Sequence, residues 1–483
     1  MKTALPQAAR FQPSLRILFR PFCQAAFALL AGCVMVGPDY NKPADPATPA
    51  WHNTSALPAA DIALATWWQQ FHDPLLDQLV KQALEGSLTL QSAEAKLREA
   101  RARRGLQFAQ VMPTSSVGLG GNRSETRTDN KRSDSHGYSA DIDASWEIDF
   151  FGGRQRAIEA ADATLNAAGY DLAAARVSLA AEVANNYIAL RAAQQRLAVT
   201  KQSVISREQT LQLTRWRFEA KLVSSLELNQ ALSSLEQARA ALPTLERTIE
   251  ESKIALAVLL GKPRSAVEAL LQADGDLPVA PAALAQRLPA DALRQRPDVQ
   301  AAERRLAAQT AQIGVAEAAR YPSLKLSGQI GVEALTPAGL LRADTIVSSL
   351  VGSLTAPLFD AGRVQRNVEI QTALRDQTLA SYRSTLLQAL ADSEKALSAI
   401  RWNAQRVEAQ QRAADAASEA ARLALINNRA GRSDLLTLLD AQRTELSQQD
   451  ALSSARGDYL TAIVQLYKAL GGGWSPAQDG DTK

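Results

Sequence analysis

The stretch "SADIDASWEIDFFGGR", Ser139 to Arg154, alternates apolar and polar side chains and then enters a long helical sequence. A period of two predicts a β-strand with two different faces. One face carries Ile142, Ala144, Trp146, Ile148 and Phe150, and the other carries Asp141, Asp143, Glu147 and Asp149. An apolar face suits lipid and an acidic face suits a water-filled lumen, so this segment is typical of a membrane strand.

An internal repeat organises the rest of the chain. With a shift of 209 residues, "RPDVQAAERRL" (Arg296 to Leu306) lies over "SLTLQSAEAKL" (Ser87 to Leu97). The same shift pairs Pro113 with Pro322 and Gly153 with Gly362. Self-similarity over so long a span predicts a tandem duplication, in which each copy has the same order of elements.

Each copy contains two segments with strand character, followed by a long helix. The four predicted strands cover about residues 113–122, 137–150, 322–334 and 347–359. About ten residues is the length that a tilted membrane strand requires. Four strands in one chain do not close a barrel, and open strand edges in hydrocarbon leave backbone groups unpaired. Several chains are therefore expected to contribute to one barrel.

Two very long helices are predicted after the strand pairs. Arg363 to Ala430 contains neither glycine nor proline, and Arg154 to Leu242 contains only Gly169. At about 1.5 Å per residue, such helices are on the order of 100 Å long. Apolar residues recur at steps of three and four, as in Val183, Tyr187, Leu190, Leu197, Val204 and Leu211, which favours coiled-coil packing. An ordinary amphipathic bundle is the alternative, although its helices are usually shorter.

The N-terminus is typical of an exported lipoprotein. Basic residues precede the short apolar run "FALLAG", and small residues stand directly before Cys33 in "LAGC". This pattern predicts a signal peptide over residues 1–32 and acylation of Cys33, with an uncleaved signal anchor as the alternative. The chain has 53 basic and 50 acidic residues. Cleavage removes four basic residues and no acidic ones, which leaves 49 and 50 and a formal charge of −1. The basic balance is then mostly a targeting feature, and no nucleic-acid partner is expected.

Catalytic signatures are not evident in the sequence. His52, His72 and His136 stand in unrelated contexts, and their spacing does not match that of metal ligands in known motifs. We expect no cofactor, no metal and no enzymatic activity.

The chain resembles the outer-membrane factors of tripartite efflux pumps, the TolC-like channels, and in particular their NodT-type lipoprotein branch. The likeness covers Cys33 to about Trp474 and is carried by "LAGC" with "VGPDYNKP", "RPDVQAAERRL", "PLFDAGR" and "RAGRSDLLTLLDAQR". It implies a mainly α protein whose homotrimer forms a 12-stranded transmembrane β-barrel and a long periplasmic α-helical barrel. It also implies a periplasmic adaptor and an inner-membrane RND transporter as partners, and an outer-membrane location with acyl chains in the lipid.

The same resemblance implies a constriction at the helical tips, near Ala430–Gly431 and Lys221–Ser225. The matching motif positions here are Leu436, Asp440 and Arg443, with Glu227 on the opposing hairpin. An apolar ring at Leu436 would exclude water, and ion pairs of Arg443 with Asp440 or Glu227 would hold the helices closed. Ordinary solvated coiled-coil charges are the alternative. The acids Asp141, Asp143, Glu147 and Asp149 predict a cation-leaning lumen, or equally strand ends at an interface.

The expected organisation has six parts: signal peptide 1–32, N-terminal arm 33–80, first repeat 81–271, linker 272–290, second repeat 291–473 and tail 474–483. The expected function is a passive exit duct for drugs or other small toxic compounds. A periplasmic coiled-coil spacer lipoprotein and an exit duct for a secreted protein are the alternatives. The alternating strands argue against a spacer, which has no need of lipid-compatible faces.

Overall fold

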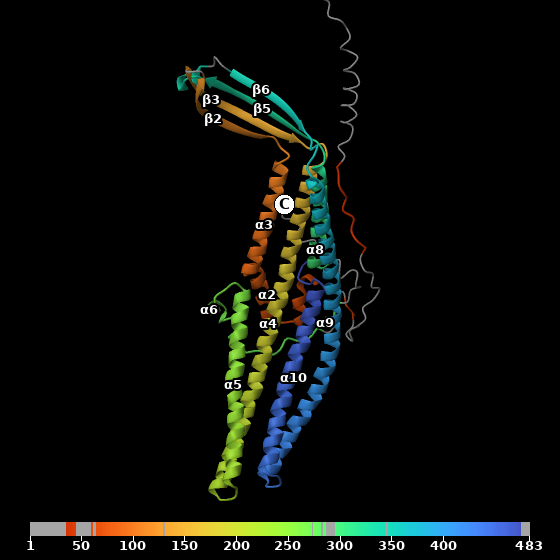
Figure 1. Cartoon of the computed structure of the whole chain (residues 1–483). Helices are drawn as coiled ribbons and strands as arrows, with labels where there is room; N and C mark the ends of the chain where they lie inside the picture. Colours follow the sequence, from red (N-terminus) through yellow and green to blue (C-terminus); the bar gives the residue numbers. More distant parts are fainter. Residues whose placement is uncertain are drawn as a thin grey trace, which may run out of the picture. The chain divides into compact units, whose positions relative to one another are not determined.

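The computed structural model describes residues 35–44, 59–60, 64–128, 131–272, 274–281, 284–285, 295–342 and 346–474. The predicted signal peptide and Cys33 therefore lie outside the described residues. In chain order the elements are β1 (Ala59–Ala60), η2 (Leu64–Phe71), α2 (Pro74–Gly86), α3 (Leu88–Ala109), β2 (Thr114–Thr128), β3 (Lys131–Ile148), α4 (Gly153–Glu219), α5 (Ser225–Leu259), α6 (Arg264–Val267), β4 (Leu284–Ala285), α8 (Pro297–Ala318), β5 (Ser323–Ala334), η3 (Pro337–Leu341), β6 (Ile346–Thr355), α9 (Arg363–Arg429) and α10 (Leu435–Ala469) (Figure 1).

The two copies of the repeat fold into helices of equal length. The helices α4 and α9 have 67 residues each, α5 and α10 have 35 each, and α3 and α8 have 22 each. At about 1.5 Å per residue, the two longest helices reach roughly 100 Å, as predicted. Among the helices that the structure describes, none combines the length and hydropathy of a membrane-spanning segment.

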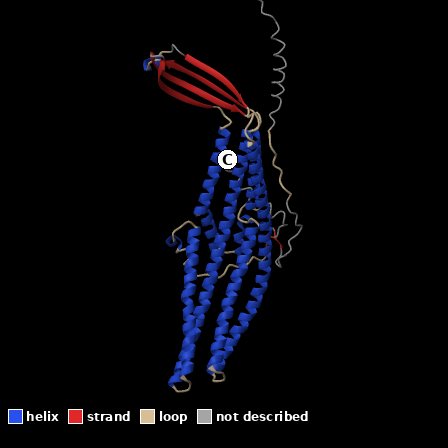
Figure 2. Ribbon diagram, viewed as in Figure 1, coloured by secondary structure: helices blue, strands red, loops and turns tan. Residues whose placement is uncertain are grey.

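The chain divides into two units, which are described separately. The first unit comprises Met1–Asn41, Ala102–Ala163 and Ala307–Gln377. The second comprises Lys42–Arg101, Thr164–Leu306 and Thr378–Lys483. The first holds a four-stranded sheet, and the second is built mainly of long helices (Figure 2).

The sheet of the first unit has the order β2-β3-β5-β6, and all its neighbours are antiparallel. It confirms the four predicted strands, but the bounds of three of them differ from the prediction. The first two strands continue through the polar run Asn122 to His136, because polar side chains do not prevent a hairpin from forming its backbone ladder. The last strand ends at Thr355, shortly before Pro357, which has no N–H to donate to a ladder.

The core of the second unit lies where α2 and η2 pack between the long helices. Trp67 stacks on Tyr467 with 5.1 Å between ring centroids, and both side chains are fully buried. Every residue of the predicted apolar stripe on α4 is buried: Val183, Tyr187, Leu190, Leu197, Val204 and Leu211. The burial of this stripe confirms that the recurring apolar residues form the packed face of the helix.

Candidate functional site: a two-faced sheet and two hairpin tips

The sheet separates apolar from polar side chains. Residues that pair directly across strands share a face, and neighbours along a strand alternate. One row joins Val117, Ile142 and Ile330, and the adjacent row joins Ser116, Asp143 and Gln329. Val117 is 75% exposed and Leu350, on the apolar side of β6, is also 75% exposed. A face with so many exposed apolar side chains has no partner within the described part of the chain.

Among the described residues of a single chain, both edges of this sheet remain open. Within that part of the chain, β2 pairs only with β3, and β6 pairs only with β5. All ten residues of β6 are exposed. Because the sheet has four antiparallel strands, its two edge strands run in opposite directions. The β6 edge of one copy is thus suited to pair antiparallel with the β2 edge of another.

Three of the four predicted lumen acids belong to the strand. Asp141, Asp143 and Glu147 lie at alternate positions of β3 and share its polar face. Glu147 also pairs with Arg154, with 2.5 Å between the carboxylate Oε2 and guanidinium Nη2 atoms.

The prediction for Asp149 was wrong, because β3 ends at Ile148. The Asp149 carboxylate instead accepts hydrogen bonds from the backbone N–H groups of Gly153, Arg154 and Gln155, at 2.8 to 3.0 Å. It therefore caps the start of α4. Asp360 does the same for α9, and the backbone donors of Val364 and Gly362 hold the pKa of its carboxyl below the usual value. In sequence, a capping acid directly after a strand is indistinguishable from a further strand residue.

The hairpins α4/α5 and α9/α10 end in matching turns. Glu219 and Arg429 end the long helices, and the turn residues Lys221 and Gly431 both have positive φ, 59° and 67°. Figure 1 shows the two turns at the same end of their helices. Asp434 caps α10 by accepting from the Thr437 N–H at 2.8 Å, and hydrogen bonds from Thr437 lower the pKa of the Asp434 carboxyl. The stabilisation of α10 by the Asp434 carboxylate is lost as the pH falls through the lowered pKa of this group, because the carboxylate becomes protonated.

The predicted tip residues form an exposed stripe on α10. Leu436, Asp440 and Arg443 are spaced by four and three positions, which places them on one face of the helix. Leu436 is 60% exposed, whereas its neighbours Leu435 and Leu438 are buried. Arg443 Nη2 donates to Asp440 Oδ1 at 2.5 Å within the helix. The stripe is therefore free to face other chains.

The predicted pairing of Glu227 with Arg443 does not occur within the chain. Glu227 instead completes a capping box with Ser224 at the start of α5. An acidic residue at this position stabilises the start of a helix, and this role explains the presence of Glu227 without an ion pair.

A contact that sequence reasoning missed joins the two tips. Arg217, near the end of α4, donates to the backbone oxygen of Asn428 at 2.7 Å and to its side-chain oxygen at 3.2 Å. The Asn428 amide in turn donates to the Ser433 carbonyl at 3.2 Å. Arg217 thus satisfies a carbonyl at the end of α9. The partners are 211 residues apart, so no local pattern reveals the contact.

The N-terminal arm of the first unit is fixed by a buried arginine. Arg156 is buried and donates to the carbonyls of Val36 and Gly37 and to the carboxylate of Asp39, at 3.1, 3.2 and 2.7 Å. Gly152, with φ +74°, allows Met35 to approach so closely that a Cβ there would lie 2.4 Å from Met35 Cγ. The arm is thereby held beside the junction of β3 and α4.

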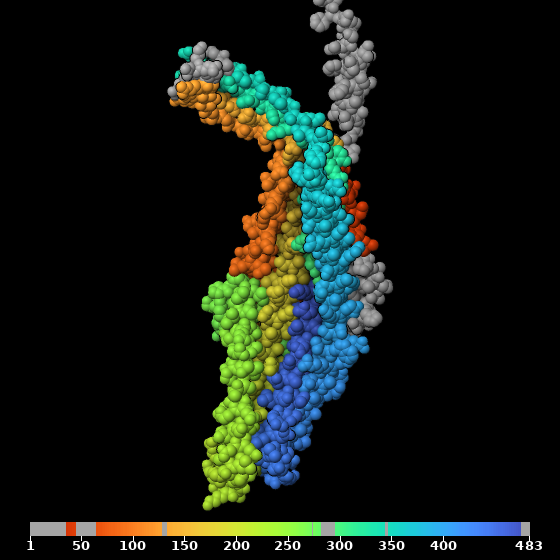
Figure 3. Space-filling view, viewed as in Figure 1, coloured from red at the N-terminus to blue at the C-terminus, as the bar shows by residue number. Residues whose placement is uncertain are grey.

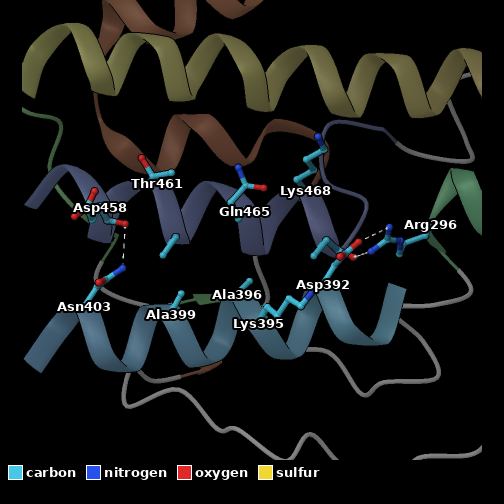
Figure 4. A pocket seen from close by; sticks show the side chains of 12 residues that line it. Arg296, Asp392, Lys395, Ala396, Ala399, Asn403, Asp458, Thr461, Gln465 and Lys468 are labelled. Atoms are coloured by element: carbon cyan, nitrogen blue, oxygen red, sulfur yellow. Dashed lines mark hydrogen bonds and ion pairs between the residues drawn. The ribbon is translucent and has the colours of Figure 1, made fainter. Parts of the chain in front are cut away.

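A groove of about 650 Å³ lies between α9 and α10 in the second unit (Figure 4). Its walls include the ion pair of Arg296 with Asp392, and Asn403 donates to the backbone oxygen of Asp458 at 3.3 Å. Lys395, Gln465 and Lys468 add further polar groups. Its lining contains no cysteine, histidine or serine. Across the described residues, no group of three or more His, Cys, Asp or Glu side chains is placed to hold a metal ion.

Comparison with known proteins places this geometry in a family. The family model described as outer membrane efflux protein matches residues 79–262 and 288–472. The pyoverdine export outer membrane protein OpmQ of Pseudomonas aeruginosa is 33% identical over 94% of this chain and 98% of its own length. Nodulation protein T of Rhizobium leguminosarum bv. viciae is 32% identical over 93% of both chains.

The solved structure of the outer-membrane channel OprN has the same fold. It superimposes with a TM-score of 0.84 at 33% identity and covers 92% of this chain and all of its own. The open edges, the duplicated helices and the family match over more than half of the sequence agree with one another. The chain belongs to the outer membrane efflux protein family and is an outer-membrane component of bacterial efflux.

Proposed function

We propose that the chain is the exit duct of a tripartite efflux system and works as a homotrimer. The observation that carries this proposal is the two-faced sheet with both edges open. Strand edges in lipid must be paired, and ring closure by repeated β6–β2 pairing satisfies every edge. Three copies of four strands give a 12-stranded barrel, the number that the resemblance to TolC-like channels implies.

The mass and the conductance of the purified protein test this proposal together. In detergent, light scattering should give the mass of three chains, and insertion into planar bilayers should give discrete conductance steps. A single-chain mass together with silent bilayers would overturn the proposal. The same recordings give ion selectivity, and we expect a preference for cations from Asp141, Asp143 and Glu147 on the polar strand face.

We also propose that the duct conducts passively and has no enzymatic role. Its cargo is expected to be small organic compounds, as the name of the pyoverdine export relative suggests. A periplasmic adaptor and an inner-membrane RND transporter would deliver the cargo and supply the energy.

The stripe of Leu436, Asp440 and Arg443 is proposed as the gate at the helical tips. Its exposure in the single chain leaves these side chains available to a ring of neighbouring copies. Replacing Asp440 and Arg443 by Ala should raise the current of the closed channel several-fold, because the charges that hold neighbouring tips together are lost. The matched control is R422A, which removes another exposed pair within one helix, that of Arg422 with Glu419. Equal closed-state currents in both variants would reject the gate.

Acylation of Cys33 is proposed to anchor the mature N-terminus in the outer membrane. Arg156 holds the arm that begins two residues later beside the end of β3, so the acyl chains would enter lipid near the strand ends. Cells fed labelled palmitate should label the wild-type chain and not the C33S variant. Label on C33S would show that another residue carries the lipid.

A further inference from the structure

A cleft of about 440 Å³ lies between α4, α5 and α10 in the second unit. Figure 3 shows α5 and α10 side by side, with α4 reaching the surface between them. The walls of the cleft carry three arginines and one carboxylate, namely Arg196, Arg207, Arg443 and Asp450.

Arg207 is a buried cation without an acidic partner. Its side chain is only 4% exposed, and Nη1 donates to the backbone oxygen and the hydroxyl of Ser234 at 2.7 and 2.8 Å. Its Nε atom is buried and has no hydrogen-bond partner. Within the described part of the chain, no carboxylate pairs with Arg207, and burial lowers the pKa of its guanidinium.

The single carboxylate of the cleft is already engaged. Both oxygens of Asp450 accept from Arg196, at 2.6 and 3.0 Å. Arg443 pairs with Asp440, which is not part of the lining. With Arg196 paired to Asp450 and Arg443 paired to Asp440, Arg207 is the cation of the lining that has no carboxylate partner among the described residues.

Burial of an uncompensated charge is unfavourable unless a counter-ion and hydrogen bonds replace the lost water. A guanidinium presents its N–H groups in a planar fork that matches an oxyanion. Gln237 and Ser447 add polar side chains to the same cleft. We propose that this cleft binds a small oxyanion, of the sulfate, phosphate or carboxylate type, with Arg207 as its central ligand.

This proposal rests on Arg207 and on the packing of three helices, and it does not require that Arg443, which also lines the cleft, acts in the gate. An occupant would neutralise the cleft and join α4, α5 and α10 more firmly. Its expected signature is a saturable gain in stability that depends on the guanidinium of Arg207.

Titration of the purified full-length protein with sodium sulfate in detergent provides the test. Sodium chloride of equal ionic strength corrects for general salt effects, and tryptophan fluorescence reports thermal unfolding. The midpoint should rise by several degrees and saturate in the wild type. It should respond less in R207K, which keeps the charge without the fork, and not at all in R207Q.

The matched control is R239Q on α5, because Arg239 is exposed and already pairs with Glu208 and Glu236. This variant should respond as the wild type does. A wild type without a saturable response, or an undiminished response in R207K and R207Q, would overturn the proposal. Crystals soaked in selenate should show an anomalous peak within hydrogen-bond distance of the Arg207 guanidinium. A carboxylate of a neighbouring copy at that place would overturn it as well.

Discussion

Four leucines near the start of α10 divide between core and surface. Leu435, Leu438 and Leu439 are buried, and two of them, Leu435 and Leu439, belong to a cluster with α4 and α5, whereas Leu436 is exposed. Residue type alone does not separate these roles, since all four are equally apolar. The helical period separates them once the packed face is known.

Alanine substitutions at these leucines should therefore separate effects on stability from effects on gating. L438A should lower the free energy of unfolding by about 2 to 5 kcal/mol, because it leaves a cavity at a side chain with 0% exposure. L436A should change stability by less than about 0.5 kcal/mol, as is usual for exposed sites, and should instead increase the closed-channel current. Urea unfolding followed by circular dichroism, with bilayer recordings in parallel, distinguishes the two. Similar losses of stability in both variants would contradict this assignment.

The errors of sequence reasoning also lie at the residue scale. The two-residue period identified the strand and its acidic face, but it extended the strand two positions too far, over Asp149, which caps a helix, and over Phe150. Glu227 matched a motif, and it also completes the capping box of its own helix start, which the motif did not indicate. The contact between Arg217 and Asn428 depends on the way two hairpins pack, and neither residue stands in a recognisable pattern.

At the scale of elements, length and period predicted most of the structure. Equal helix lengths in the two copies follow from a duplication that the sequence shows directly, and the apolar stripe on α4 is buried throughout. The extent of β2 and β3 was underestimated, because a polar hairpin carries no apolar alternation to mark it as strand.

The two faces of β6 give a test by matched substitution. Leu350 belongs to the apolar face, and its neighbour Ser349 belongs to the polar face. L350R should lower the free energy of unfolding in lipid by about 2 to 4 kcal/mol, because the new side chain places a charge toward hydrocarbon near the middle of the strand. S349R should insert normally and shift the ion selectivity toward anions. Recovery of folded protein from outer-membrane fractions measures the first effect and reversal potentials measure the second. Poor insertion of S349R alone would reverse the assignment of faces.

At the scale of the whole molecule, the open edges predict how copies associate. β2 and β6 have unpaired backbone groups on one side in the single chain, whereas β3 and β5 are paired on both sides. In an assembled ring, edge pairing between copies should protect all four strands alike.

Hydrogen–deuterium exchange of the purified assembly measures this protection strand by strand. Peptides from β2 and β6 should exchange as slowly as those from β3 and β5, which serve as internal standards. Fast exchange of both edge strands beside slow central strands would show that the edges stay unpaired. The number of copies in the ring is not visible in one sequence, because it depends on strand tilt and register between chains.

The unequal strand lengths have a practical consequence. β3 pairs with β5 only as far as Tyr138, while its ladder with β2 continues to Lys131 and Thr128. Residues 122–128 of β2 and 131–137 of β3 thus form a two-stranded polar ribbon that projects past the β3–β5 ladder. In an embedded ring this overhang would stand clear of the lipid on the far side from the helices that follow the strands. It offers an antibody epitope or a dye attachment point on living cells that leaves the conduit itself untouched.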